Sequence, residues 1–159
     1  MIFVTVGSEL PFDRLIRAMD AWAAIHPGEE VLAQVGAGRF QPAHMRWERR
    51  MGRAEYAAAI EAAELVVAHA GMGSVVTAGV HGRPIVVLPR RVRFGEVRNE
   101  HQLEAAARLA GWPGIAVAET ETELPERIAA ARAAGAAGLV VSRTAPTAFL
   151  ARLRAFVLE

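Results

Sequence analysis

The 159-residue chain contains no cysteine, so disulfide bonds, thiolate nucleophiles and cysteine-ligated metals are excluded. No apolar run approaches the roughly 20 residues of a membrane-spanning helix. Met1 leads directly into a predicted strand, so we expect no signal peptide. The formal net charge is +1, which gives no overall argument for nucleic-acid binding. The five histidines are scattered without metal-ligand spacing, so we expect no metal site. These absences favour one cytoplasmic domain.

What the chain does have is a regular alternation of short apolar runs and amphipathic segments. Strands are predicted at 1–6, 30–35, 65–68, 85–88 and 115–117, and a further short strand within 39–52 is left open. Helices are predicted at 12–23, 54–63, 74–81, 99–110, 122–134 and 146–157. This order predicts an α/β fold, a doubly wound, Rossmann-like parallel sheet, as a single domain over residues 1–159.

The most informative stretch is 65–91, LVVAHAGMGSVVTAGVHGRPIVVLPRR. It predicts a strand, a glycine turn, a helix and a second strand. Gly71 and Gly73 permit a tight turn and let another group approach the backbone closely. The free N–H groups at such a helix start can bind an anion in the usual ligand crevice of an open α/β sheet. The simpler alternative is that the glycines only make the turn.

Polar clusters follow three of the predicted strands, at Gly7-Ser8-Glu9, at 69–74 and at 96–102. Because the carboxyl ends of parallel strands meet at one edge, these clusters can converge. Their backbone donors, hydroxyls, amides and carboxylates suit a ligand with a diphosphate and a polyol. Taken singly, His69 can equally be a half-buried structural histidine, and the arginines of 90–98 can be a solvated loop or a contact to phosphate.

Familiar catalytic motifs do not fit the central turn. No Lys-Ser or Lys-Thr pair follows the glycines, so it is not a Walker loop. Ser74 has no glycine two residues before it or two residues after it, whereas a nucleophile elbow requires both. Val76 occupies the third position of a dinucleotide fingerprint, and the next strand ends in Pro89-Arg90 rather than an acidic residue, which disfavours NAD.

Taken in order, the motifs resemble the C-terminal domain of family 28 glycosyltransferases. The residues that carry the resemblance are VTVGS, PFDRLI, VVAHAGMGS, GRPIVVLPRR, FGE and the Glu-His-Gln run at 100–102. The chain is most similar to the small single-domain members. These include bacterial exopolysaccharide subunits and the cytosolic subunit of the eukaryotic enzyme that adds the second GlcNAc to dolichol-linked GlcNAc. The resemblance covers roughly residues 1–110.

The resemblance implies the fold of the donor-binding, C-terminal half of a GT-B hexosyltransferase that uses a UDP-sugar. It implies that the Gly7-Ser8 turn and the turn at 71–74 hold the diphosphate, with His69 near the base or the diphosphate. Glu100 and Gln102 would reach the sugar hydroxyls. Helix starts would neutralise the leaving diphosphate, so neither metal nor cofactor is expected. The expected substrate-binding residues are Gly7, Ser8, His69, Gly71, Met72, Gly73, Ser74, Thr77, Arg90, Glu96, Asn99, Glu100, His101 and Gln102.

The chain departs from the family pattern at Thr77, where the two-domain members carry a glutamate that grips the ribose. A hydroxyl can still hydrogen-bond, so we do not interpret Thr77 as a loss of activity.

The resemblance also implies a partner, because a GT-B enzyme has two halves and this length accommodates one. We expect a membrane-associated subunit that brings the acceptor, a lipid-linked saccharide, and the catalytic base, so no catalytic residue is assigned here. The chain would then lie in the cytoplasm at the inner face of the membrane, docked through helix 146–157 and the basic loop 90–98. Two alternatives remain open. One is a non-catalytic nucleotide-sugar-binding or regulatory module, and the other is an NADP-binding domain that uses Arg90 or Arg91.

Overall fold

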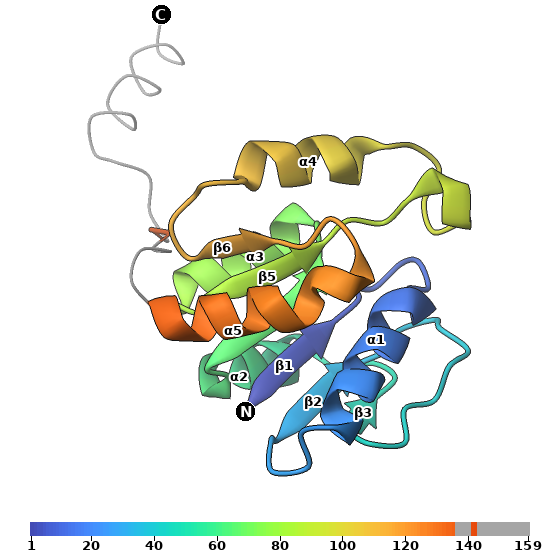
Figure 1. Ribbon diagram of the computed structural model, residues 1–159, viewed down its shortest axis with the longest axis vertical. Helices are drawn as coiled ribbons and strands as arrows, with labels where there is room; N and C mark the ends of the chain where they lie inside the picture. The colour runs from blue at the N-terminus through green and yellow to red at the C-terminus, as the bar shows by residue number, and fades with distance from the viewer. Residues whose placement is uncertain (136–140, 143–159) are drawn as a thin grey trace, which may run out of the picture.

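The computed structural model describes residues 1–135 and 141–142, which form a six-stranded parallel sheet with helices on both faces (Figure 1). The strands are β1 (Ile2–Thr5), β2 (Val31–Gln34), β3 (Arg46–Glu48), β4 (Leu65–His69), β5 (Ile85–Leu88) and β6 (Ile115–Val117). Their spatial order is β3-β2-β1-β4-β5-β6, and every neighbouring pair is parallel. The predicted doubly wound sheet is confirmed, and its strand order reverses between β1 and β4. Such a switch point is where open α/β sheets form their ligand crevice.

The helices follow the strands as predicted, with small shifts at their ends. They are α1 (Asp13–Ala24), α2 (Arg53–Ala62), α3 (Met72–Val80), α4 (His101–Leu109) and α5 (Leu124–Ala134), with two short 3₁₀ turns, η1 (Val92–Phe94) and η2 (Glu121–Glu123). The prediction that α4 starts at Asn99 is wrong. The Asn99 side chain accepts a hydrogen bond from the His101 N–H at 3.3 Å, and this local turn forms ahead of the helix. The predicted helix 146–157 lies outside the described residues.

Both faces of the central strands β1, β4 and β5 are buried, which explains why these strands are continuous apolar runs. Side chains alternate between the faces, so Val4 and Val67 pack with α1 and α5 while Phe3 and Val66 pack with α2, α3 and α4. Figure 1 shows α1 and α5 in front of the sheet and α2 behind it. No helix in the described part of the chain is long and apolar enough to cross a bilayer.

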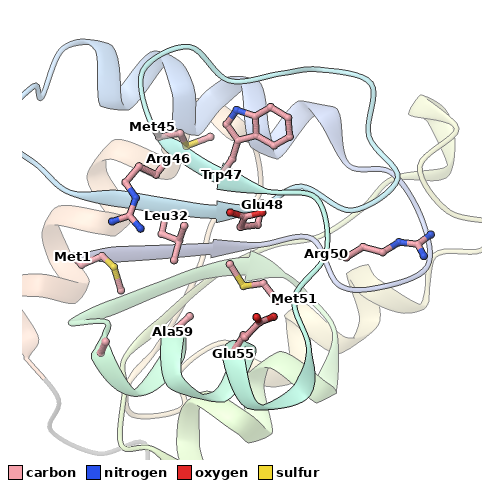
Figure 2. A pocket seen from close by; sticks show the side chains of 11 residues that line it. Met1, Leu32, Met45, Arg46, Trp47, Glu48, Arg50, Met51, Glu55 and Ala59 are labelled. Atoms are coloured by element: carbon pink, nitrogen blue, oxygen red, sulfur yellow. The ribbon is translucent and has the colours of Figure 1, made fainter.

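The α2 face is left partly open over β2 and β3. A groove of about 790 Å³ lies there. Figure 2 shows Leu32 of β2 and Met51 among the side chains between this part of the sheet and α2, which carries Ala59. Charged side chains, Arg46 and Glu55 among them, stand around this apolar floor. The groove lies beside the strands rather than at their carboxyl ends, so it is not the ligand crevice expected for this fold.

Candidate functional site

A cleft of about 830 Å³ lies at the carboxyl edge of the sheet, beyond the ends of β1 and β4, where the strand order reverses. Loops after β1, β2, β3 and β5 contribute to its lining, as do His69 at the end of β4 and the first turns of α3. Eight of the residues predicted from the sequence line it together: Gly7, Ser8, His69, Gly73, Ser74, Thr77, Arg90 and Gln102. The three polar clusters therefore converge, as the parallel topology requires.

His69, the last residue of β4, is the side chain around which the two glycine turns are built. A Cβ atom on Gly7 would lie 2.7 Å from the His69 Cε1 atom, and one on Gly71 would overlap the Nε2 atom. Gly7 also has a φ of +77°, a conformation that favours glycine. The imidazole ring thus occupies space that only glycine leaves free at both turns.

The His69 ring is neutral near pH 7. Burial and the positive charge of Arg90 lower its pKa from 6.5 to about 4, against a smaller opposing contact with the Thr5 backbone. The Nδ1 atom is buried and has no hydrogen-bond partner among the described residues. A neutral ring can offer one donor and one acceptor to a ligand.

The free energy of unfolding is expected to decrease as pH is lowered, because of His69. Between pH 6.5 and about 4 the unfolded chain binds a proton that the folded ring does not, so the free energy of unfolding decreases as pH falls through this window. From pH 7 to pH 4.5 the loss due to this group is on the order of 2 kcal/mol. Urea unfolding of the wild type and His69→Gln across this range measures it, since the variant lacks the titrating ring. Parallel pH profiles for the two proteins would contradict the assignment.

The start of α3 provides free backbone donors beside His69. The amides of Ser74 and Val75 bond to the Gly71 carbonyl at 3.2 and 3.3 Å, whereas those of Met72 and Gly73 have no partner among the described residues. An anion can therefore bind to these two N–H groups at the positive end of the helix. Gly73 lines the cleft, whereas Met72, which is 54% exposed, is not among the lining residues.

Two hydroxyls near this helix start are already engaged. The buried Ser74 Oγ lies 3.2 Å from the Tyr56 hydroxyl, which fixes α2 against α3. Thr77 donates its hydroxyl proton to the Gly73 carbonyl at 2.7 Å. Thr77 can therefore accept a hydrogen bond from a ligand but has no free proton to donate.

Arg90 is the structural support of the first glycine turn. Its side chain is 96% buried, and Nη2 donates to the carbonyls of Val6 at 2.7 Å and Leu10 at 2.6 Å. Its Nε atom is buried without a partner among the described residues. The Arg90 backbone N–H donates to Gln102 Oε1 at 3.1 Å, which ties the third cluster to the cleft.

Of the rest of the third cluster, Val97 lines the cleft and the charged side chains do not. Glu96 accepts bonds from Arg14 Nε at 2.8 Å and from the Arg91 backbone N–H at 2.9 Å, so both its carboxylate oxygens are occupied outside the cleft. Glu100 accepts a bond from the Val92 N–H at 3.3 Å. Neither these side chains nor those of Asn99 and His101 line the cleft, so their contact with a ligand stays a prediction.

The cleft also contains residues that the sequence interpretation did not assign to it. Those beyond the β2 and β3 ends are Gln34, Gly36, Arg50, Met51, Arg53 and Tyr56. Gln34 is fixed by Thr5 Oγ1 at 2.8 Å and by the Gly7 carbonyl at 3.0 Å. For Arg50 and Arg53, the signal in the sequence was the basic segment around the short strand within 39–52 that the prediction left open. Within the described residues no three histidine, aspartate or glutamate side chains gather as a metal site.

Comparison with protein families gives one match. The family model described as Glycosyltransferase family 28 C-terminal domain matches residues 1–147. No curated protein matches the chain.

Comparison with solved structures gives distant but extensive similarity. The glycotransferase of kitacinnamycin is 22% identical with a TM-score of 0.62, over 97% of this chain and 37% of that chain. ALG13 is 18% identical with a TM-score of 0.58, over 96% of this chain and 93% of that chain. The C-terminal CMP-Kdo binding domain of WaaA from Acinetobacter baumannii is 11% identical with a TM-score of 0.52, over 84% and 80%. The chain thus spans less than half the length of the first of these proteins and nearly all of the second.

Proposed function

The chain belongs to the glycosyltransferase family 28 C-terminal domain family and has the fold of the C-terminal half of a GT-B glycosyltransferase, and from this membership we propose that its cleft binds a UDP-sugar donor. The proposed reaction transfers the sugar to a lipid-linked saccharide. A separate, membrane-associated subunit supplies the acceptor site and holds this chain at the inner face of the membrane.

The observation that carries the proposal is the convergence of two glycine turns on one cleft at the switch point of the sheet. The Gly7 turn and the start of α3 present backbone to the same space, and the amides of Met72 and Gly73 are free to bind oxygen atoms of a diphosphate. We assign Ser8 and Ser74 to the same end of the donor.

The sugar is assigned to the other end of the cleft, beside Gln102. The Gln102 side-chain oxygen is taken by the Arg90 N–H, so its amide N–H₂ is the group available for sugar hydroxyls. Glu96 receives no ligand role in this assignment, because Arg14 and Arg91 already occupy its carboxylate.

In the proposed transfer, the bond between the anomeric carbon and the diphosphate oxygen breaks as the acceptor oxygen bonds to that carbon. The acceptor hydroxyl loses its proton to a base on the partner. This chain stabilises the departing diphosphate through the amides at the α3 start and through the Gly7-Ser8 turn. Because the proposal places the base on the partner, we expect the isolated chain to bind the donor without transferring its sugar.

Thermal unfolding with UDP, GDP, dTDP, ATP, NAD and NADP tests the donor assignment. Ligand at a hundred times its dissociation constant adds about 2.7 kcal/mol of stability. For a domain of this size we expect the midpoint to rise by roughly 5–10 °C with UDP alone. A rise with NADP and none with UDP would replace the proposal by the dinucleotide alternative.

Activity is tested separately, by co-expression with an acceptor-half subunit and a labelled UDP-sugar. Transfer to a lipid-linked saccharide is the expected result. A stable pair that binds UDP but moves no sugar would favour the non-catalytic module instead.

A further inference from the structure

Two arginines at the cleft have no acidic partner. Arg50 lies in the connection between β3 and α2, and Arg53 is the first residue of α2. Both are exposed and both line the cleft, and neither forms an ion pair within the described part of the chain. Arg14 and Arg132, by contrast, each pair with two glutamates. Two guanidinium groups at this cleft are therefore free of an acidic partner among the described residues.

Arg50 lines both the apolar groove and the cleft, and its side chain extends toward the cleft. In Figure 2 its side chain extends past the carboxyl ends of β2 and β1, away from Leu32 and Ala59. Gly7 and Ser8, in the loop that follows β1, line the same cleft as Arg50. Arg53 stands three residues before Tyr56 in α2, and the Tyr56 hydroxyl lies 3.2 Å from Ser74 Oγ in α3, so the starts of the two helices are neighbours.

The charge of the cleft is strongly unbalanced. Arg50, Arg53 and Arg90 contribute three positive charges to its lining, and Glu9 is the one carboxylate among the described lining residues. Arg90 is committed to the Val6 and Leu10 carbonyls, so the two exposed arginines are the ones available to a ligand. A cleft with this excess positive charge attracts a ligand that carries more than one negative charge.

We propose that Arg50 and Arg53 bind the phosphate groups of the donor's nucleoside diphosphate, together with the amides at the start of α3. This inference rests on the proposed function and names two binding residues for it. A guanidinium group presents two parallel N–H donors that match the oxygens of a phosphate, and such charge-assisted bonds are stronger than neutral ones. The arginines would then also hold the diphosphate while the bond to the sugar breaks.

The test compares charged and uncharged forms of one ligand by calorimetry on the full chain, using uridine, UMP and UDP. Arg50→Gln and Arg53→Gln are each expected to weaken UDP binding about tenfold or more and to leave uridine binding unchanged. Arg50→Lys and Arg53→Lys keep the charge but lose the paired donors, so they should recover part of the loss. Arg108→Gln is the matched control, because Arg108 is an exposed arginine of α4 that lines neither the cleft nor the groove.

The outcomes separate this inference from the function on which it rests. Unchanged UDP affinity in both glutamine variants would overturn it, and so would equal losses for uridine and UDP, which would indicate a change of pocket shape. If the wild type binds GDP or ADP instead of UDP, the donor assignment fails. The same variants are then tested with that diphosphate and its nucleoside, and a loss confined to the diphosphate still supports the two arginines as phosphate ligands.

Discussion

Replacing Gly71 with alanine is expected to lower the free energy of unfolding by about 3 kcal/mol and to weaken nucleotide binding, whereas Gly73→Ala should leave stability unchanged or higher. The two glycines stand two residues apart in the same turn and differ in what surrounds them. A Cβ atom on Gly71 would overlap the His69 imidazole, while one on Gly73 meets no atom within 4 Å. Gly73 also lies inside α3, where alanine is the better helix former by about 1 kcal/mol.

The expected loss of stability in Gly71→Ala comes from the lack of room for a Cβ atom and not from the backbone conformation. Gly71 has a φ of −105°, which any residue adopts without strain. The His69 ring cannot retreat freely, because a ring that leaves the Gly71 turn must move against the Gly7 turn or out into the cleft. In the first case stability falls, and in the second the ring obstructs the space assigned to the diphosphate.

A double variant isolates the contact. His69→Ala removes the ring that a Cβ atom at position 71 would strike, so adding Gly71→Ala to His69→Ala should cost almost nothing further. The two single changes are therefore expected to be strongly non-additive in urea unfolding at pH 7, as residues in direct contact are. Additive losses in the free energy of unfolding would show that Gly71 is needed for another reason. The contact with the His69 ring would then not explain why this turn requires glycine.

The sequence predicted the sheet well because its strands are buried on both faces. Runs such as Ile85–Leu88 have no polar alternation, and helix α1 has a clear apolar stripe. The strand at Arg46–Glu48 remained uncertain, because a three-residue edge strand with two exposed side chains carries almost no periodic signal. The convergence of the three polar clusters followed from topology alone, since parallel strands end at one edge.

What the sequence could not predict were side-chain partners separated by long stretches of chain. Glu96 stood among polar residues that suggested sugar binding, yet its partner is Arg14, 82 residues earlier. Arg90 was predicted among the substrate-binding residues, but its guanidinium supports the Gly7 turn from inside. Arg50 reaches the cleft from a segment with no motif. Each outcome depends on which side chains meet in three dimensions, and no local pattern encodes that.

Replacing Arg90 with methionine is expected to be the most damaging change at the site, with a loss of about 4 kcal/mol in the free energy of unfolding. Methionine fills much of the same volume but cannot donate to the carbonyls of Val6 and Leu10, and both would lose the bonds that Arg90 gives them. Arg93→Met is the matched control. Arg93 is an exposed arginine of η1 whose contact is with the Phe94 ring at 4.7 Å, so its loss should cost less than 1 kcal/mol.

A second measurement separates the positioning role of Arg90 from a general loss of packing. The Arg90 charge helps to lower the pKa of His69 to about 4, so in Arg90→Met the His69 pKa should rise toward 6.5, as followed by the ring signals in NMR. UDP binding should weaken as well, because the Gly7-Ser8 turn loses its support while the bond between the backbone N–H at position 90 and Gln102 can remain. If the variant were as stable as wild type and His69 still titrated near pH 4, Arg90 would neither hold the turn nor set the charge of the ring. The geometry of the cleft would then have to be maintained by the glycines and His69 alone.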